Sequence, residues 1–220
     1  MPANDISLGK PVKRRRDSDR TKENILTVAT KEFADNGFAG ARMDLIAERT
    51  HTTKRMIYYY FGDKEGLYQA VLEQSYGAIR ALERDLDTSG LGPVEAIRAL
   101  AELTFDHHEQ HPDFIRLVAG ENLLRGEHIR RSEVLMRLGT PAADLLSQIL
   151  SEGQDRGVFR SDVDALDVHM IISSYCVFRI ANRHTWLALF GRDMIAPESH
   201  DHQRRILADM VVAFLRHHAD

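Results

Sequence analysis

Residues 42–64 gather side chains whose chemistry suits contact with DNA. The stretch RMDLIAERTHTTKRMIYYYFGDK places basic and aromatic residues close together in its second half. Arg55 can donate two parallel hydrogen bonds to guanine, Met56 can touch a thymine methyl group, and tyrosine hydroxyls and Lys64 can bind phosphates. The competing interpretation is that the tyrosines pack a small three-helix core while the charged side chains form a solvated face.

Two short helices joined by a tight turn would present these side chains. Apolar residues recur at Met43, Ile46 and Ala47, the polar run 50–53 follows, and residues 54–61 form the second helix, with Thr53 as its predicted N-cap. At about 100° per residue, one face of the second helix carries Ile57 and Phe61. The other face carries Lys54, Arg55, Tyr58 and Tyr59. This spacing is typical of a helix-turn-helix motif, in which one face packs and the other contacts DNA.

Longer helices are expected on both sides of this motif. A first helix is predicted from Ser18 to Asn36-Gly37, because Ile25, Ala29 and Phe33 recur at helical spacing. A long connecting helix is predicted from Lys64 to about Asp87, with Asp63 as its cap.

The charge of the chain is unevenly distributed. Residues 1–60 hold twelve Lys and Arg against eight Asp and Glu, whereas the remainder holds seventeen against twenty-five. This asymmetry favours a polyanion as the partner of the N-terminal part. Residues 1–17 are predicted to form a flexible basic arm, in which Arg14, Arg15 and Arg16 contact phosphates or an adjacent minor groove. The alternative is a disordered, solvated tail.

Residues 20–68 resemble the DNA-binding domain of the tetracycline-repressor (TetR) family of bacterial transcription regulators. The resemblance rests on four groups of residues: Phe33, Gly37 and Phe38; Ile46, Ala47 and Glu48; Thr53, Lys54, Ile57, Tyr58, Tyr59 and Phe61; and Lys64, Glu65 and Leu67. It implies that base edges are contacted by Lys54, Arg55, Met56 and Tyr59. It also implies that the DNA backbone is held by Arg42, Thr53, Tyr58, Tyr60 and Lys64.

Two positions depart from the family pattern. Thr50-His51-Thr52 stands where the family usually has Ala-Gly-Val, and Arg55 stands where it usually has a small residue. His51 adopts a left-handed backbone only at some cost, so a slightly reshaped turn is expected. Arg55 makes the operator of a relative a poor guide to the operator of this chain.

The remainder of the chain is predicted to be helical, which makes the fold class all-α. The N-terminal helix-turn-helix domain is expected over residues 18–66, and an all-helical effector-binding and dimerisation domain over residues 67–220. No strand pattern or internal repeat is found in the sequence. Breaks at Gly and Pro residues predict helices near 93–110, 112–124, 127–137, 141–156, 164–190 and 199–217.

The last two predicted helices carry apolar stripes. The stripe of residues 164–190 includes Val168, Ile171, Ile172, Tyr175, Phe178, Ile180 and Ala181, and that of residues 199–217 includes Ile206, Leu207, Met210, Val211, Phe214 and Leu215. The resemblance implies a homodimer in which two such helices of each subunit form a four-helix interface. The alternative is that both stripes are buried within one chain.

Polar residues on the apolar C-terminal helices are candidates for a small-molecule pocket. The candidate ligand-binding residues are Phe105, His108, Arg116, Asn122, Tyr175 and Arg179. An alternative leaves Arg116 and Glu121 at the surface or in an internal ion pair.

His107 and His111 lie one helical turn apart and have the spacing for zinc or nickel, but His111 precedes Pro112, which disfavours helical backbone there. We therefore predict a polar pocket wall or surface at these histidines, and neither a metal nor a cofactor. Cys176 is interpreted as a small buried apolar residue, with a redox sensor as the alternative.

Several function classes are disfavoured by the sequence. The single cysteine cannot form an internal disulfide, and no apolar run approaches the roughly twenty residues of a membrane span. A glycine-rich phosphate loop, a nucleophile elbow and paired carboxylates are not found, so an enzyme is not expected. We therefore expect a cytoplasmic, dimeric transcription regulator, in particular a repressor, that binds a palindromic operator in double-stranded DNA and is released by a small-molecule effector. The alternative is a helical ligand or metal sensor that acts through a protein partner without binding DNA.

Overall fold

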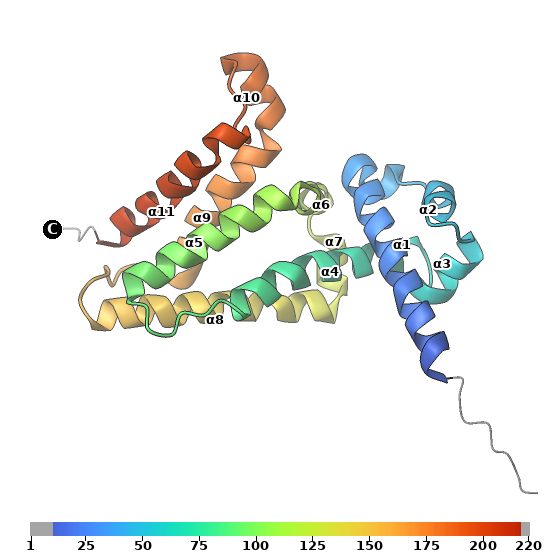
Figure 1. Cartoon of the computed structure of the whole chain (residues 1–220), viewed down its shortest axis with the longest axis horizontal. Coiled ribbons are helices and arrows are strands. Elements are labelled where there is room, and N and C mark those ends of the chain that lie inside the picture. Colours follow the sequence, from blue (N-terminus) through green and yellow to red (C-terminus); the bar gives the residue numbers. More distant parts are fainter. Residues whose placement is uncertain (1–10, 217–220) are drawn as a thin grey trace, which may run out of the picture. The chain divides into compact units, whose positions relative to one another are not determined.

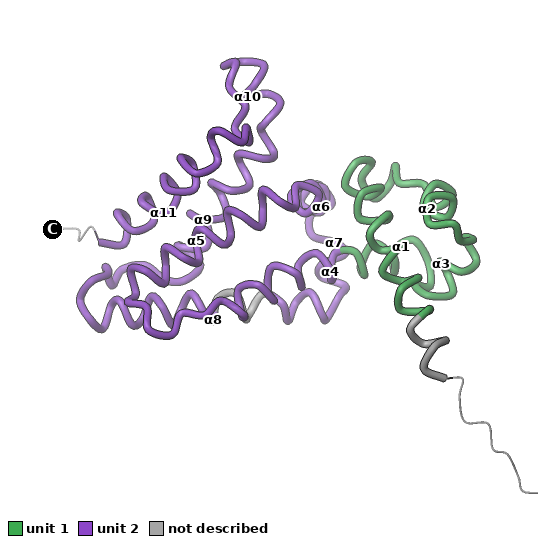
Figure 2. The backbone as a smooth tube through the Cα atoms, in the orientation of Figure 1, with its two compact units in different colours: residues 1–71 green, residues 72–220 purple. Residues whose placement is uncertain are grey.

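The chain folds as two helical units. The structure, a computed structural model, describes residues 11–216 and, within them, the side chains of residues 17–138 and 144–216. Every regular element of the described residues is a helix, which confirms the all-α prediction (Figure 1). The described residues up to Val71 form one compact unit and those from Leu72 onward form the other (Figure 2). Among the described residues, no helix combines the length and apolar character that crossing a bilayer requires.

The first unit consists of α1 (Pro11–Gly40), α2 (Met43–Arg49), α3 (Lys54–Phe61) and the first two turns of α4 (Lys64–Arg84). α1 begins at Pro11, so the predicted start at Ser18 is wrong. The reason is that Lys and Arg are good helix formers and that Pro favours the first helical position. Residues 1–10 of the predicted arm, and the side chains of Arg14, Arg15 and Arg16, lie outside what the structure describes.

Aromatic and aliphatic side chains form the core of the first unit. Ile25, Phe33 and Ile46 are almost fully buried, and so is Ile57 of α3. The Tyr68 ring of α4 packs edge-on against Phe33, with ring centroids 4.9 Å apart. The helical path of α1 is interrupted at Gly37, where φ is 66° and ψ is 173°, in agreement with the predicted stop at Asn36-Gly37.

The second unit contains the rest of α4 and the helices that follow. These are α5 (Pro93–Gln110), α6 (Pro112–Leu123), α7 (Glu127–Arg131), α8 (Glu133–Asp155), α9 (Ala165–Ala181), α10 (Arg183–Phe190), the short 3-10 helix η1 (Pro197–Ser199) and α11 (His200–Arg216). α5 lies at the centre and packs against α8, α9 and α11. The main core of this unit includes Ile97, Phe105, Val168, Leu207 and Val211.

Two predicted helix boundaries in this unit are wrong. α8 runs without a break through residues 139–141, where a break was predicted, and begins instead after Ser132, whose hydroxyl accepts a hydrogen bond from the Leu135 N–H at 3.2 Å. Leu135 and Leu146 lie three turns apart on one face and are both buried, so packing along α8 outweighs the local Gly-Thr-Pro signal.

The predicted helix 164–190 is divided at Asn182, which has φ −101° and ψ 7°. α10 then begins at Arg183, whose guanidinium forms two hydrogen bonds with the Asp193 carboxylate at 2.9 and 2.7 Å. This ion pair holds the start of α10 against Asp193, which follows the end of the helix. The helical period of the sequence does not predict such a contact.

Candidate nucleic-acid interface and effector cavities

α3 is held by its buried face and presents the opposite face to solvent. Ile57 is fully buried, whereas Tyr59 is 77% exposed and Met56 is 37% exposed. The helix begins where the Thr53 hydroxyl accepts a hydrogen bond from the Met56 N–H at 3.2 Å, as predicted. It ends at Gly62, which has a φ of 82° that favours glycine. Lys54, Arg55 and Tyr58 lie on the exposed side as well.

The turn between α2 and α3 has a left-handed residue at His51, with φ 52°. The Thr52 N–H donates to the Ala47 carbonyl at 3.0 Å and the Thr50 N–H to the Ile46 carbonyl at 3.1 Å, so the end of α2 is well bonded. The turn therefore keeps the conformation that glycine would adopt, and the histidine carries the conformational cost.

Glu32 of α1 fixes the start of α2. Its carboxylate is 2% exposed and accepts hydrogen bonds from the Arg42 backbone N–H and from the Arg49 guanidinium, each at 3.1 Å. A carboxylate at the first turn of a helix also interacts favourably with the helix dipole. The sequence analysis missed this residue, although Glu32 follows Ala29 by one turn on the apolar face of α1.

Besides Thr53, three of the expected DNA-contacting residues form polar contacts within the protein through their side chains. Lys54 Nζ lies 2.6 Å from Asp44 Oδ1 in an exposed ion pair. Lys64 Nζ donates to the backbone carbonyls of Ala41 at 2.6 Å and Ala39 at 3.2 Å, and desolvation by burial lowers the pKa of its ammonium group. The Tyr60 hydroxyl accepts a hydrogen bond from Ser18 Oγ at 3.5 Å.

These contacts show what the three side chains do within the unit. Lys64 joins the start of α4 to the last turn of α1 and to Ala41 after it, and Tyr60 contacts α1. Arg42 is exposed, and the carboxylate of Glu32 engages only its backbone. The exposed part of the expected interface is therefore centred on Arg55, Met56, Tyr58 and Tyr59.

The six expected ligand-binding residues do not form one pocket. Arg116 and Asn122 are exposed and line neither of the two cavities described below. Arg116 pairs with Asp113 at 3.3 Å, and the Asn122 amide donates to the Val118 carbonyl at 2.9 Å. Arg116 lies about 200° around α6 from the buried Phe114, and Asn122 stands in the last turn of the helix, where it is exposed.

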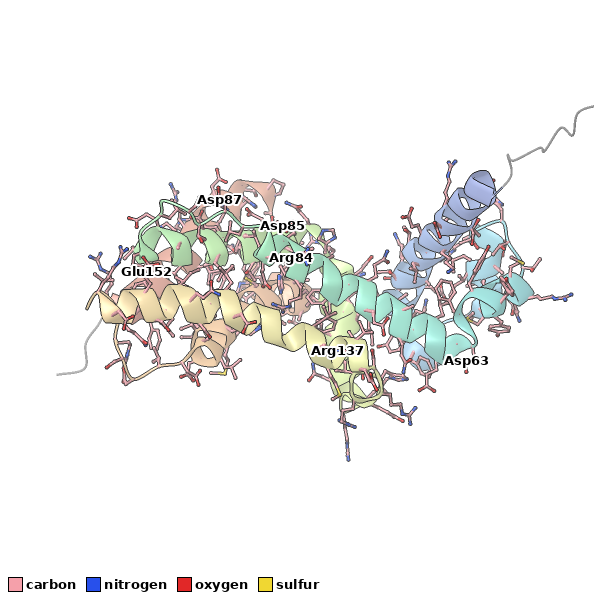
Figure 3. The ribbon with its side chains drawn as sticks, turned by 90° about the horizontal axis from the view of Figure 1, so that it is seen from below. Asp63, Arg84, Asp85, Asp87, Arg137 and Glu152 are labelled. Carbon is pink, nitrogen blue, oxygen red and sulfur yellow. The ribbon has the colours of Figure 1, made fainter. Side chains whose placement is uncertain are left out.

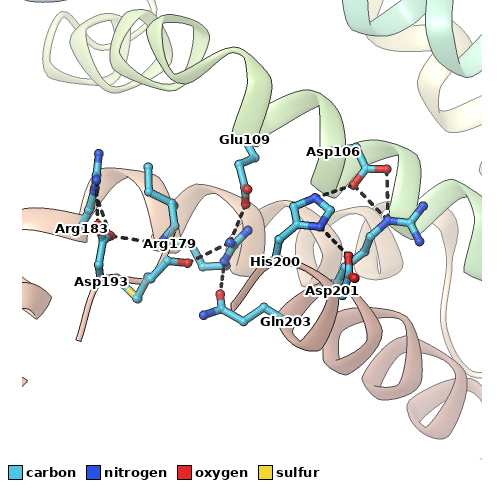
Figure 4. A network of polar contacts seen from close by, with 11 residues as sticks. Asp106, Glu109, Arg179, Arg183, Asp193, His200, Asp201 and Gln203 are labelled. Carbon is cyan, nitrogen blue, oxygen red and sulfur yellow. Dashed lines mark hydrogen bonds and ion pairs between the residues drawn. The ribbon is translucent and has the colours of Figure 1, made fainter. Parts of the chain in front are cut away.

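Tyr175 and Arg179 line a groove of about 540 Å³ between α9, α10 and α11, together with Phe178, Trp186, Ile206 and Met210. Arg179 is nevertheless a structural residue (Figure 4). Its Nε donates to Gln203, and its Nη2 donates to Glu109 at 2.6 Å and to the Met194 carbonyl at 2.9 Å. Its guanidinium carbon also lies 3.9 Å from the centroid of the buried Phe105 ring. Arg179 therefore joins α5, α9 and α11.

A second cavity, of about 170 Å³, is formed by α4, α5, α6 and α9. Its polar lining comprises Tyr76, Arg80, Glu83, Thr104, His108, His169 and Ser173. Of the six expected ligand-binding residues, only His108 lines it. The sequence analysis missed Arg80, Glu83 and His169, and the available signal was that polar residues stand beside Ile79 and Val168 on otherwise apolar helices.

The histidines at this cavity are neutral. Burial lowers the pKa of His108 to about 4. The neighbouring His107 does not line this cavity, and its pKa falls to about 3 through burial and the nearby His108, His111 and Arg80. The His108 Nδ1 lies 2.8 Å from the Thr104 carbonyl and must carry the proton of that hydrogen bond, so Nε2 is an acceptor. Desolvation by burial also lowers the pKa of His169.

The His107 and His111 rings lie 4.6 Å apart, centroid to centroid. No third His, Cys, Asp or Glu joins them in a metal-binding group among the described residues. Cys176 is 1% exposed, and burial raises the pKa of its thiol to about 12.

Comparison with known proteins agrees with this geometry. Residues 25–71 match the family of bacterial regulatory proteins described as tetR, and residues 93–211 match the tetracyclin repressor-like C-terminal domain. The HTH-type transcriptional repressor NicS of Pseudomonas putida is 35% identical over 203 residues, which are 92% of this chain and 96% of that protein. The repressor SCO4008 of Streptomyces coelicolor is 30% identical over 170 residues, 71% of this chain and 77% of that protein.

The crystal structure of SCO4942, a transcriptional regulator of Streptomyces coelicolor, superposes with a TM-score of 0.68 at 28% identity, covering 90% of this chain and 99% of that one. The match to the C-terminal family alone spans more than half of the chain. The chain therefore belongs to the TetR family of bacterial transcription regulators.

Proposed function

We propose that the chain is a transcriptional repressor that binds a near-palindromic DNA operator as a homodimer and releases it when a small molecule occupies the second unit. The observation that carries this proposal is the exposed face of α3, where Arg55, Met56 and Tyr59 project while Ile57 is fully buried. Its role is regulation and not catalysis. Because its target is bacterial DNA, it acts in the cytoplasm.

Arg55 contacts a base, in this proposal, and sets the preference at one position of each half-site. Its guanidinium has the geometry for two hydrogen bonds to guanine. Arg55→Ala is expected to cost about 1–3 kcal/mol on operator DNA and to relax the preference at that position. The control is Arg137→Ala on α8, an arginine that is also exposed (Figure 3). Equal losses on operator and random DNA would refute a base-reading role.

The basic residues Arg14, Arg15 and Arg16 contribute charge and no sequence preference. Removal of residues 1–16 is expected to weaken binding to all DNA sequences alike and to flatten the salt dependence of the affinity. A change of preferred sequence in this variant would contradict that division of roles.

The homodimer forms through α9 and α11. Val168, Ile172 and Leu207 on these helices are buried in the core of their own chain, but Met170 is 64% exposed and Met210 is 46% exposed. These exposed apolar side chains support a partner subunit at this face. Met170→Glu is expected to shift the chain toward monomer in sedimentation experiments. Leu123→Glu on α6, where the side chain is 86% exposed, is the matched control.

The dimer accounts for a symmetric operator. Two α3 helices entering successive major grooves require half-sites about 34–36 Å apart. Selection from random DNA is expected to yield an inverted repeat. A monomer at micromolar concentration, or a selected site without symmetry, would refute the proposal.

Release of DNA is proposed to act through α4. This helix begins at Lys64, directly after the Gly62-Asp63 link from α3, and supplies Tyr76, Arg80 and Glu83 to the small cavity. Coupling of about 1–3 kcal/mol would change operator affinity about 5–150-fold, and operator DNA would weaken effector binding by the same factor. An effector that binds the second unit and leaves operator affinity unchanged would overturn this mechanism.

A further inference from the structure

The small cavity contains a positive charge whose hydrogen-bonding capacity is only partly used. Arg80 of α4 has a side chain that is 12% exposed, and its Nη1 donates to Oε2 of Glu83, which is 7% exposed. Its Nε is buried and has no hydrogen-bond partner among the described residues. A buried donor that is left unsatisfied is costly, so this nitrogen calls for an acceptor.

The position of the unused nitrogen identifies the kind of acceptor. On a guanidinium, the Nε–H and one Nη2–H point in parallel along the side opposite Nη1, and this pair matches the two oxygens of a carboxylate. Glu83 occupies the Nη1 side. The side of the fork that holds a carboxylate in two parallel hydrogen bonds therefore remains for a ligand.

The other walls indicate an aromatic ring. Tyr76 and Phe114 pack edge-to-face with centroids 5.1 Å apart, and the neutral His108 ring lies 5.5 Å from Phe114 in the same manner. Ile115 and Val118 complete an apolar wall. The cavity volume of about 170 Å³ is close to that of an engineered cavity of about 150 Å³ that binds benzene.

We propose that this cavity binds a one-ring aromatic monocarboxylate, with its carboxylate on the Nε–Nη2 side of Arg80 and its ring against Tyr76, His108 and Phe114. Tyr76 and Ser173 also line the cavity, and the Ser173 hydroxyl lies 3.3 Å from His169 Nε2, so polar side chains stand beside the apolar wall. The binding site stands by itself, and only the release of DNA by the ligand rests on the proposed function.

Glu83 sets the charge balance of the site. Its carboxylate and that of the ligand would share one guanidinium, and repulsion between the two weakens binding. Arg80 and Glu83 come from α4, while the ionisable groups that the other elements contribute to the lining are His108 of α5 and His169 of α9, both of which are uncharged there. Replacing Glu83 by glutamine is therefore expected to strengthen carboxylate binding.

The test is calorimetric titration of the full-length chain with benzoate, a hydroxybenzoate and a pyridine monocarboxylate. Benzamide serves as the uncharged analogue, and cyclohexanecarboxylate as the analogue without an aromatic ring. At least one aromatic acid is expected to bind with a dissociation constant below about 1 mM and at least about tenfold more tightly than either its amide or the cyclohexane acid. Binding of none of the aromatic acids, or equal affinity for acid and amide, would overturn the proposal.

Variants then locate the site. Arg80→Met is expected to weaken binding of the acid by about 30-fold or more. Arg80→Lys is expected to weaken it by about tenfold, because lysine lacks the forked pair of donors. Glu83→Gln is expected to strengthen binding of the acid by about tenfold. Amide binding should change little in all three. Because Arg80→Met leaves Glu83 buried without its partner, circular dichroism must accompany it. Val118→Trp fills the cavity without touching the ion pair, and Leu123→Trp on the exposed side of the same helix is its control.

Operator binding is measured separately, so that the two proposals can fail separately. An acid that binds through Arg80 and leaves operator affinity unchanged refutes the regulatory mechanism and leaves the site intact. A chain that binds a symmetric operator but none of the aromatic acids refutes the site and leaves the proposed function intact. An acid that binds equally well to the Arg80→Lys and Val118→Trp variants lies elsewhere in the protein and overturns the assignment.

Discussion

The carboxylate of Glu32 is expected to be the main polar determinant of stability in the DNA-binding unit. It is 2% exposed and accepts hydrogen bonds from the Arg42 N–H and the Arg49 guanidinium, each at 3.1 Å. The bond to the backbone N–H is worth about 1.5–3 kcal/mol because its acceptor is charged. Since the Arg49 side chain is 52% exposed, its ion pair adds only about 0–1 kcal/mol.

Glu32→Ala is therefore expected to lower the free energy of unfolding of this unit by about 2–4 kcal/mol. Glu32→Gln keeps an acceptor for the Arg42 N–H and should cost about half as much. Glu23→Ala, at an exposed position on the same helix, is the control and should stay within about 0.5 kcal/mol of the unmodified protein.

Amide hydrogen exchange is the suitable assay, because a chain of two units need not unfold in a single transition. Protection should fall in α1, α2 and α3 and remain unchanged in α5 and α8. A loss no larger than that of Glu23→Ala, or a loss spread equally over α5 and α8, would refute the reasoning.

Three further predictions concern the second unit. Gly153→Ala would place a Cβ 1.9 Å from Cδ2 of the buried Phe159 ring, whereas a Cβ at Gly77 meets no described atom within 4 Å. Gly153→Ala should therefore lower the free energy of unfolding by about 1–3 kcal/mol, and Gly77→Ala should raise it by up to about 1 kcal/mol. Denaturation followed by the fluorescence of Trp186, the one tryptophan in the sequence, measures both changes. Because burial raises the pKa of Cys176 to about 12, this thiol should react with a disulfide reagent at pH 8 only as fast as the protein opens, and a fast native reaction would contradict its burial. The pKa of His108 is lowered to about 4 from its ordinary 6.5, so the unfolded chain binds more protons between these values. The contribution of His108 should lower the free energy of unfolding by about 3 kcal/mol as the pH falls from above 6.5 to below 4. His108→Gln should flatten this part of the dependence of stability on pH.

The helix-turn-helix could be predicted from the sequence because its determinants are local. Thr53 caps α3 and Gly62 ends it, and both roles depend on residues at most a few positions away, while the apolar spacing that includes Ile57 marks the face that is buried. The boundaries of α8 and α10 could not be predicted, since they depend on packing over three turns and on the Arg183–Asp193 pair.

The structure does not bring the expected ligand-binding residues into one pocket, for the same reason. Arg116 and Asn122 carry suitable chemistry but lie on the exposed side of α6. Arg80 and His169 belong to helices separated by almost ninety positions and meet only through the packing of α4 and α9 against α5 and α6. Helical periodicity identifies the buried face of each helix, but it does not specify which buried faces enclose a common cavity.

The burial of Cys176 makes the protein convenient for distance spectroscopy. The only native thiol is inaccessible, so a cysteine introduced at a surface position would be the single site for a nitroxide label, without prior removal of the natural residue. Tyr59→Cys, at a position 77% exposed, would place one label on α3 of each chain. In a homodimer the two labels form a single pair, and the distribution of their separation would report directly on how far apart the helices stand before and after an effector is added.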